Sequence, residues 1–97
     1  MPFSHQLKFP PLNGASVTAR LDRWHQKPSA FLERGDAIAD ICIDGMAYKL
    51  CVDFPCAFSS VKAHAGEIVS TGDVIGACAA EGEDLPYHRE SLVIQAI

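Results

Sequence analysis

The sequence predicts a single all-β domain, and three observations support this fold class. Four of the six prolines fall within the first 28 residues and disfavour helix there. Beyond them, short apolar runs alternate with Gly and Asp, and no window keeps a helical period over several turns. An ungapped internal repeat relates residues 32–42 to residues 69–79. Many short strands at even spacing indicate a β-sandwich or a β-barrel.

Eight runs are expected to form strands. Each run is close to the usual strand length, and turn signals rich in Pro, Gly or Asp separate one run from the next. In chain order, the expected strands are Gln6–Phe9, Ser16–Arg23, Ser29–Leu32, Ile38–Ile43, Ala47–Val52, Ala57–Ala63, Glu67–Val69 and Val74–Ala80.

The clearest local signal is the stretch ICIDGMAYKL, residues 41–50. Asp-Gly between two apolar flanks is typical of a tight β-hairpin, with Asp44 and Gly45 at its tip. This hairpin is expected to project from one end of the molecule, midway along the chain. In the implied register, Ile43 pairs with Met46, Cys42 with Ala47 and Ile41 with Tyr48.

The internal repeat places a Gly-Asp turn before a buried strand twice. Gly35-Asp36 matches Gly72-Asp73, 37 residues later, and Ile38 matches Ile75. Gly provides the backbone freedom of a tight turn, and the Asp carboxylate accepts a hydrogen bond from a nearby backbone amide. The β-branched residue that follows suits a buried strand. Two copies of this unit predict two similar halves related by a pseudo-twofold axis.

Charge and length narrow the classes of function. A net charge of −4 argues against binding to the nucleic-acid backbone, which requires a basic face. No apolar run approaches the ~20 residues that cross a bilayer, and the N-terminus lacks the basic and apolar regions of a signal peptide. We therefore expect a cytoplasmic protein that binds neither nucleic acid nor membrane and keeps its cysteines reduced.

The cysteines and histidines give no sign of a metal centre, and no catalytic site is indicated. No Cys-x-x-Cys pair occurs, no histidine lies at metal-ligand spacing from another His or Cys, and the serines lack a nucleophile motif. The cysteines lie among apolar residues and are expected to fill the core. Cys56, which follows Pro55 in an expected loop, is the most plausible reactive thiol. The residues concerned are Cys42, Cys51, Cys56, Cys78, His5, His25, His64 and His88.

Four fragments together resemble the biotinyl/lipoyl domain family, most closely the lipoyl domains of the acyltransferase component of 2-oxo acid dehydrogenase complexes. The resemblance implies a flattened β-barrel, or barrel-sandwich hybrid, made of two quasi-symmetric four-stranded sheets. It covers about residues 7–80, within a biotinyl/lipoyl-like domain that we assign to residues 1–80. The fragments, which keep the family's spacing without insertion, are LKFPPL (7–12), LDRW (21–24), RGDAIADICIDGM (34–46) and AGEIVSTGDVIG (65–76).

The hairpin tip departs from the family pattern. In the family, a lysine at this position receives lipoate through an amide bond. Here Asp44 matches the family's Asp, Gly45 replaces the lysine, and Met46 matches the Ala that follows it. The resemblance therefore implies the shape of a carrier domain without its chemistry, and we expect no cofactor. Two loops also depart: the family's first Gly-Asp is missing near Ser29-Ala30, and residues 52–60 differ from its A-P-x-x-G pattern.

Residues 81–97 differ in character and are expected to form a C-terminal extension with an extra strand. Residues 81–84 are an acidic spacer, Pro86 is a break, and SLVIQAI at 91–97 is apolar and β-prone. An exposed strand of this kind is normally paired. It adds either to this domain's own sheet or to another subunit's sheet. We favour the second alternative, as a hypothesis of homodimer formation through residues 91–97.

These features lead to three hypotheses of function. The leading one is a non-catalytic lipoyl-like binding or assembly module, without covalent cofactor, that docks to a partner enzyme or multienzyme complex. The alternative is a genuine biotin or lipoate carrier that shuttles carboxyl or acyl groups. AYKL (47–50) resembles the family's biotinylation box and makes Lys49 the candidate acceptor. The third is a small-molecule or metal-binding protein that uses the loop around Cys56.

Overall fold

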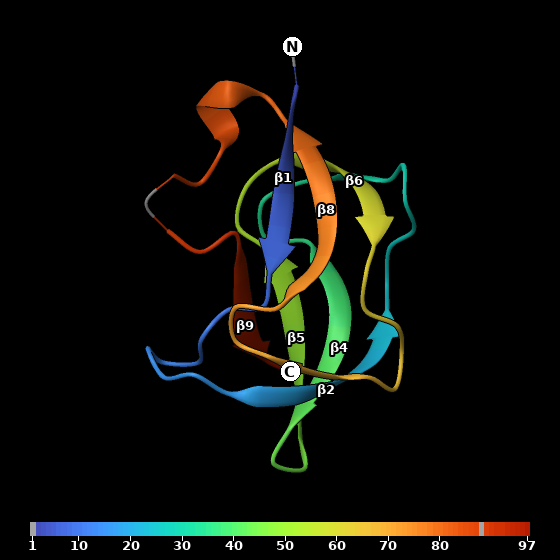
Figure 1. Ribbon diagram of the computed structural model, residues 1–97, viewed down its shortest axis with the longest axis vertical. Coiled ribbons are helices and arrows are strands. Elements are labelled where there is room, and N and C mark those ends of the chain that lie inside the picture. The colour runs from blue at the N-terminus through green and yellow to red at the C-terminus, as the bar shows by residue number, and fades with distance from the viewer. Residues whose placement is uncertain (1, 88) are drawn as a thin grey trace.

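The computed structural model describes residues 2–87 and 89–97 and consists of two antiparallel β-sheets packed face to face (Figure 1). The four-stranded sheet has the order β1-β8-β6-β3, and the five-stranded sheet has the order β7-β2-β4-β5-β9. This confirms the predicted all-β fold class.

No helix in the described ranges is long and apolar enough to cross a membrane. The elements are β1 (Phe3–Lys8), β2 (Thr18–Trp24), β3 (Phe31–Leu32), β4 (Ala37–Ile43), β5 (Met46–Val52), β6 (Cys56–Val61), β7 (Ile68–Ser70), β8 (Val74–Ala80), the 3-10 turn η1 (Gly82–Asp84) and β9 (Leu92–Ala96).

The two halves of the chain follow the same plan, as the internal repeat predicts. β4 and β8 begin 37 residues apart and bury the same positions along the strand. The turn before each strand is also repeated, because Gly35 and Gly72 have φ values of +93° and +95°, a region that glycine enters without strain. In both turns the carboxylate of the following Asp accepts a hydrogen bond of 2.8 Å from the backbone N–H three residues earlier.

Strand pairing repeats in the same register, so the pseudo-twofold relation extends to both sheets. Leu21 pairs with Ile41 as Phe58 pairs with Cys78, and an irregularity follows each pair at the same point. β1 pairs with β8 in the same way as β5 pairs with β4. A register shift occurs at equivalent points, between Leu7 and Lys8 in the first pair and between Ala37 and Ala39 in the second. Hence β1, β2, β3 and β4 correspond to β5, β6, β7 and β8. Among the described residues, β9 is the strand without a counterpart.

A continuous apolar core fills the space between the sheets. Burial of each large side chain in it contributes about 1.5–3 kcal/mol relative to exposure. Trp24 packs on this core, with its ring 5.4 Å from that of Phe58 and its indole N–H donating to the carbonyl of Ala63 at 2.9 Å. Large, fully buried side chains come from both halves: Leu7, Phe9, Leu21, Leu32, Ile38, Ile41, Leu50, Phe54, Phe58, Ile75 and Leu92.

Most predicted strands differ from the observed ones by a few residues at their ends, and two of these differences have local reasons. The first begins at Phe3 rather than Gln6, because β1 pairs with β8 along its whole length. The third was expected from Ser29 onward but is reduced to Phe31–Leu32. Ser29 has a φ of +82°, which lies outside the extended region that a strand requires.

The C-terminal extension returns to its own chain. β9 pairs antiparallel with β5, and the N–H of Asp53 donates to the carbonyl of Ser91 at 3.0 Å. Arg89 donates to the carboxylate and the carbonyl of Asp53 at 3.2 and 3.1 Å. The preference for pairing with another subunit is therefore not met in this chain, because β5 offers an open edge that the extension reaches. A homodimer through residues 91–97 stays a prediction.

The symmetry makes a matched pair of core substitutions informative. Ile38 and Ile75 occupy equivalent positions in β4 and β8 and are 0% and 1% exposed. Because each truncation leaves a buried cavity, Ile38→Ala and Ile75→Ala should each lower the free energy of unfolding by about 2–5 kcal/mol, measured in urea. Met46→Ala, at an exposed residue, is the control and should stay within about 0.5 kcal/mol. A loss below about 1 kcal/mol in only one isoleucine variant would contradict their equivalence, and such a loss in both would contradict their role in the core.

Candidate functional site

The β4–β5 hairpin projects from one end of the molecule, at the bottom of the view in Figure 1. Its turn has φ values of +50° at Asp44 and +79° at Gly45, and two successive positive φ angles are typical of a type I′ turn. The three cross-strand pairs predicted below the turn are confirmed. The sequence thus places this hairpin correctly, and its apex is the two-residue turn itself.

The apex carries a carboxylate and a thioether but no amine. Asp44, Gly45 and Met46 are exposed, and 61% of Met46 is accessible to solvent. A Cβ added to Gly45 would meet no atom within 4 Å, so this residue faces open space. Such an apex can contact a partner, but it cannot form an amide with lipoate or biotin.

Lys49 lies along β5, three residues beyond Met46, and not at the apex. It pairs with Asp40 of β4 on one side and with Gln95 of β9 on the other. Lys49 is exposed and borders an open depression of about 690 Å³. The candidate acceptor is therefore flanked by strands on both sides.

A His–Asp pair lies in the same depression. The Nε2 atom of His25 is 2.7 Å from Oδ1 of Asp40, and the guanidinium of Arg23 lies 3.8 Å from Oδ2. Such a pair can orient an imidazole as a base, but the described residues lining the depression include no hydroxyl or thiol for it to activate. Sequence reasoning missed this pair because its members are 15 residues apart. The pairing of β2 with β4 is the signal that could have found it.

Beside the hairpin, a row of residues crosses the outer face of the five-stranded sheet, one each from β7, β2, β4 and β5. The row joins apolar groups to a charged pair, since Ile68 is 64% exposed and the guanidinium of Arg20 lies 2.6 Å from the carboxylate of Asp22. Apolar groups bordered by polar ones are typical of protein interfaces. We call this row together with the apex the tip surface: Ile68, Arg20, Cys42, Ala47, Asp44, Gly45 and Met46.

Three of the four cysteines are buried, and all four are free thiols. Cys56 is 1% exposed and begins β6, so it is not the loop thiol that the sequence suggested. Its hydrogen bond with Cys78 lowers the pKa of Cys56 against the opposing effect of burial, and the same bond, together with burial, raises the pKa of Cys78. Because Cys56 is almost completely buried, a reagent in water does not reach its thiol, and the hypothesis of a site built on Cys56 gains no support from this geometry.

The described histidines lie apart from one another, and no group of residues in the described ranges is arranged to hold a metal ion. His64 pairs with Glu67 at 3.0 Å on the surface. His5, on β1, places its ring edge-on to that of Phe54, with the ring centroids 5.5 Å apart. His88 lies outside the described residues.

Comparisons with known proteins add no assignment to this geometry. No family model matches the chain, and no curated protein matches it. The assignment of a function therefore depends on the hairpin apex, on the position of Lys49 and on the family resemblance of the sequence.

The environment of His5 predicts a pH dependence of stability. Burial, and then the charge of Lys8, hold the pKa of His5 below its ordinary value of 6.5. As the pH falls below 6.5, the unfolded chain binds this proton before the folded chain does, so the free energy of unfolding decreases. Urea unfolding between about pH 7.5 and pH 5.5 should show the decrease, and His5→Gln should reduce it. Ser4→Gln, at an exposed and non-titrating residue of the same strand, should keep it. An unchanged slope in His5→Gln would count against this role of His5.

Proposed function

We propose that this chain is a non-catalytic, lipoyl-like binding or assembly module, which docks to a partner enzyme or multienzyme complex and carries no covalent cofactor. The observation that carries the proposal is the residue at the hairpin apex. Gly45 takes the position at which the resembling family presents its lysine. Acylation by lipoate or biotin forms an amide with a primary amine, and this apex supplies none. The proposed setting is the cytoplasm, where the four free cysteines remain reduced.

The position of Lys49 supports the same proposal. In the resembling family, the ligase reads an acceptor amine that stands at the exposed tip of the hairpin. Lys49 instead lies in the body of the sheet, directly opposite Asp40 and next to β9. The carboxylate of Asp40 is held by His25 and Arg23, so the backbone pairing of β5 with both neighbouring strands is what keeps Lys49 in the body of the sheet.

The tip surface supports docking as the activity of the module. Met46 exposes 61% of its surface beside the apex, next to Asp44, whereas Ile68 exposes 64% on the outer face of the sheet, where Arg20 also lies. Exposed apolar groups within a polar rim are the usual anchors of a protein contact.

The second candidate function is a biotin or lipoate carrier modified on Lys49. The exposure of Lys49 favours it, since a ligase must reach the acceptor amine. A carrier of this kind would shuttle carboxyl or acyl groups between active sites. The two candidates differ in one measurable quantity, the mass of the chain after exposure to a ligase.

Intact-mass measurement separates the two candidates. The wild-type chain, co-expressed with a lipoate ligase or a biotin ligase and the matching cofactor, should keep its unmodified mass. Gly45→Lys places an amine at the apex at a cost of about 1 kcal/mol for a side chain at positive φ, and it should gain one acyl group. A mass increase of the wild-type chain that Lys49→Ala removes would establish the carrier and refute the binding module.

Site-specific photo-crosslinking tests the docking surface. A photoreactive residue at Met46, in cells that naturally produce the chain, should give a discrete adduct with one protein partner. The same residue at Glu83 is the control, because Glu83 is exposed on η1 at the opposite end of the molecule (Figure 1). Equal adducts from both positions, or none from position 46, would refute docking through the hairpin.

A further inference from the structure

The pseudo-twofold relation is broken at one place, the outer edge of β1. Its counterpart β5 is paired on both sides, with β4 and with β9. β1 pairs with β8 on one side, and no other strand among the described residues pairs with it. An open edge presents unpaired backbone N–H and C=O groups and is a template for another strand.

Because β1 is equivalent to β5, the pairing of β5 with β9 shows which backbone groups of β1 are left unpaired. β9 approaches β5 through the hydrogen bond from the N–H of Asp53 to the carbonyl of Ser91. Because backbone groups alternate along a strand, the N–H groups of Cys51 and Lys49 also face β9. The equivalent residues of β1 are Lys8 and Gln6, whose backbone groups therefore face away from β8.

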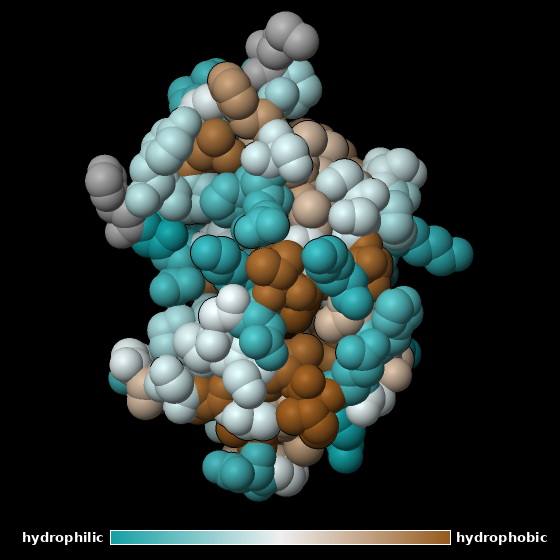
Figure 2. Space-filling model, in the orientation of Figure 1, coloured by the Kyte–Doolittle hydropathy of each residue, from teal (hydrophilic) through white to brown (hydrophobic). Residues whose placement is uncertain are grey.

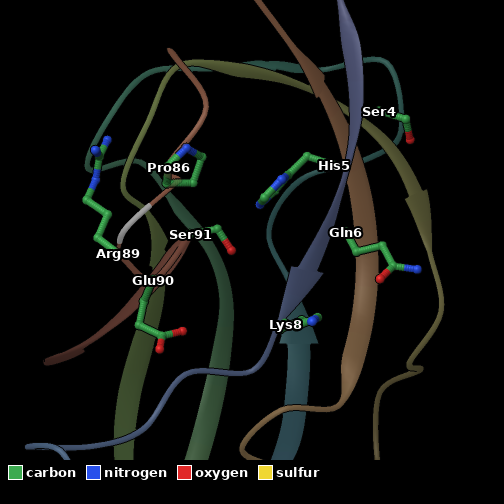
Figure 3. Close-up of a pocket in the computed structure, with 8 residues that line it drawn as sticks. All are labelled: Ser4, His5, Gln6, Lys8, Pro86, Arg89, Glu90 and Ser91. Carbon is green, nitrogen blue, oxygen red and sulfur yellow. The ribbon is translucent and has the colours of Figure 1, made fainter. Parts of the chain in front are cut away.

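The place beside β1 that corresponds to the place of β9 beside β5 is a groove. A cavity of about 280 Å³ runs along β1 and is lined on its far side by Pro86, Arg89, Glu90 and Ser91. Figure 3 shows His5 pointing from β1 across this space toward Pro86 and Ser91, while Gln6 and Lys8 line the β1 side. Residues therefore stand on both sides of the space into which an added strand would enter.

The charges of the groove define the chemistry of an occupant. Lys8, on the β1 side, takes part in no ion pair within the described residues. On the opposite side, the guanidinium of Arg89 is held by Asp53, and Glu90 adds a carboxylate. In the mirrored register, Lys8 faces the position that Val93 has on β5, and Leu7 faces the position of Ile94. Figure 2 shows hydrophilic residues over this side of the face, with hydrophobic residues gathered lower in its middle. A carboxylate therefore suits the first position and an apolar side chain the second.

We propose that the edge of β1 binds an extended segment of a partner protein, which adds as an antiparallel strand with an acidic side chain opposite Lys8 and an apolar side chain opposite Leu7. This site is separate from the hairpin and does not depend on the function proposed for it. Pro10 stands where Asp53 stands in the other half and has no N–H to donate. The paired segment therefore ends at Lys8, and binding is confined to a few residues.

A peptide derived from β9 tests the site. The probe has the sequence of residues 91–96 with Val93→Glu, acetylated and amidated at its ends. NMR titration of the full chain should show saturable binding below about 1 mM, with shifts concentrated on β1. N-methylation of the peptide's Glu or Gln amide removes a bond to β1 and should weaken binding at least about tenfold. N-methylation of its Ile amide, which faces away from β1, is the matched control and should change binding less than about threefold.

Charge reversal tests the pairing with Lys8. Lys8→Glu should weaken binding of the Glu peptide by about two- to fivefold, and a peptide with Lys at the same position should regain it. Lys62→Glu makes the same charge change at an exposed residue outside the groove and should have no effect. The methylated peptides test the proposal on the wild-type chain, so it does not depend on the folding of any variant.

Several results would overturn the proposal. These are the absence of saturable binding, equal binding of all three methylated peptides, and shifts that map to β5 through displacement of β9. A dimer of the wild-type chain that Gln6→Pro dissociates, seen by sedimentation, would assign the edge to a second copy instead. Proline suits this test because it removes one outward N–H from an edge strand.

Discussion

The rest of the fold depends on the two Gly-Asp turns, because each carries the chain from one sheet to the other. The first joins β3 to β4 and the second joins β7 to β8, and in both cases the two strands belong to different sheets. The N–H groups of Gly35 and Gly72 donate to the carbonyls of Val52 and Phe9 at 2.8 Å, so each turn is also fixed to the end of a neighbouring strand. Apart from the β4–β5 hairpin, the other links between consecutive strands also pass from one sheet to the other, and together these crossings bring the two sheets face to face and enclose the core between them.

The sequence predicts the features that local turn chemistry determines. Asp-Gly and Gly-Asp pairs indicate the hairpin register and the repeated halves, since such turns require particular φ angles at particular positions. The sequence does not predict which edge residues 91–97 join, because an apolar β-prone run suits any open edge. It also misses the contact of His25 with Asp40, which depends on the bulge after Leu21, and residue pattern does not reveal that shift of register.

At the hairpin apex, backbone geometry and side-chain chemistry compete for one residue. A type I′ turn needs positive φ at both central positions, where glycine is least strained. Gly45 satisfies this need, and in the module proposed above it also leaves the apex without the amine that the resembling family presents there. The tight turn and the missing amine thus have a single origin, and Lys49 cannot replace the amine at the apex because its position in the strand ladder is fixed.

The contact between Cys56 and Cys78 offers a way to detect local opening of the four-stranded sheet. The two sulfur atoms come from adjacent strands, β6 and β8, and both residues are almost completely buried. A thiol-specific reagent in water therefore reaches them only while those strands are apart, and its rate of reaction reports the free energy of that opening. The rate at which these buried thiols react therefore measures how often the four-stranded sheet opens between β6 and β8.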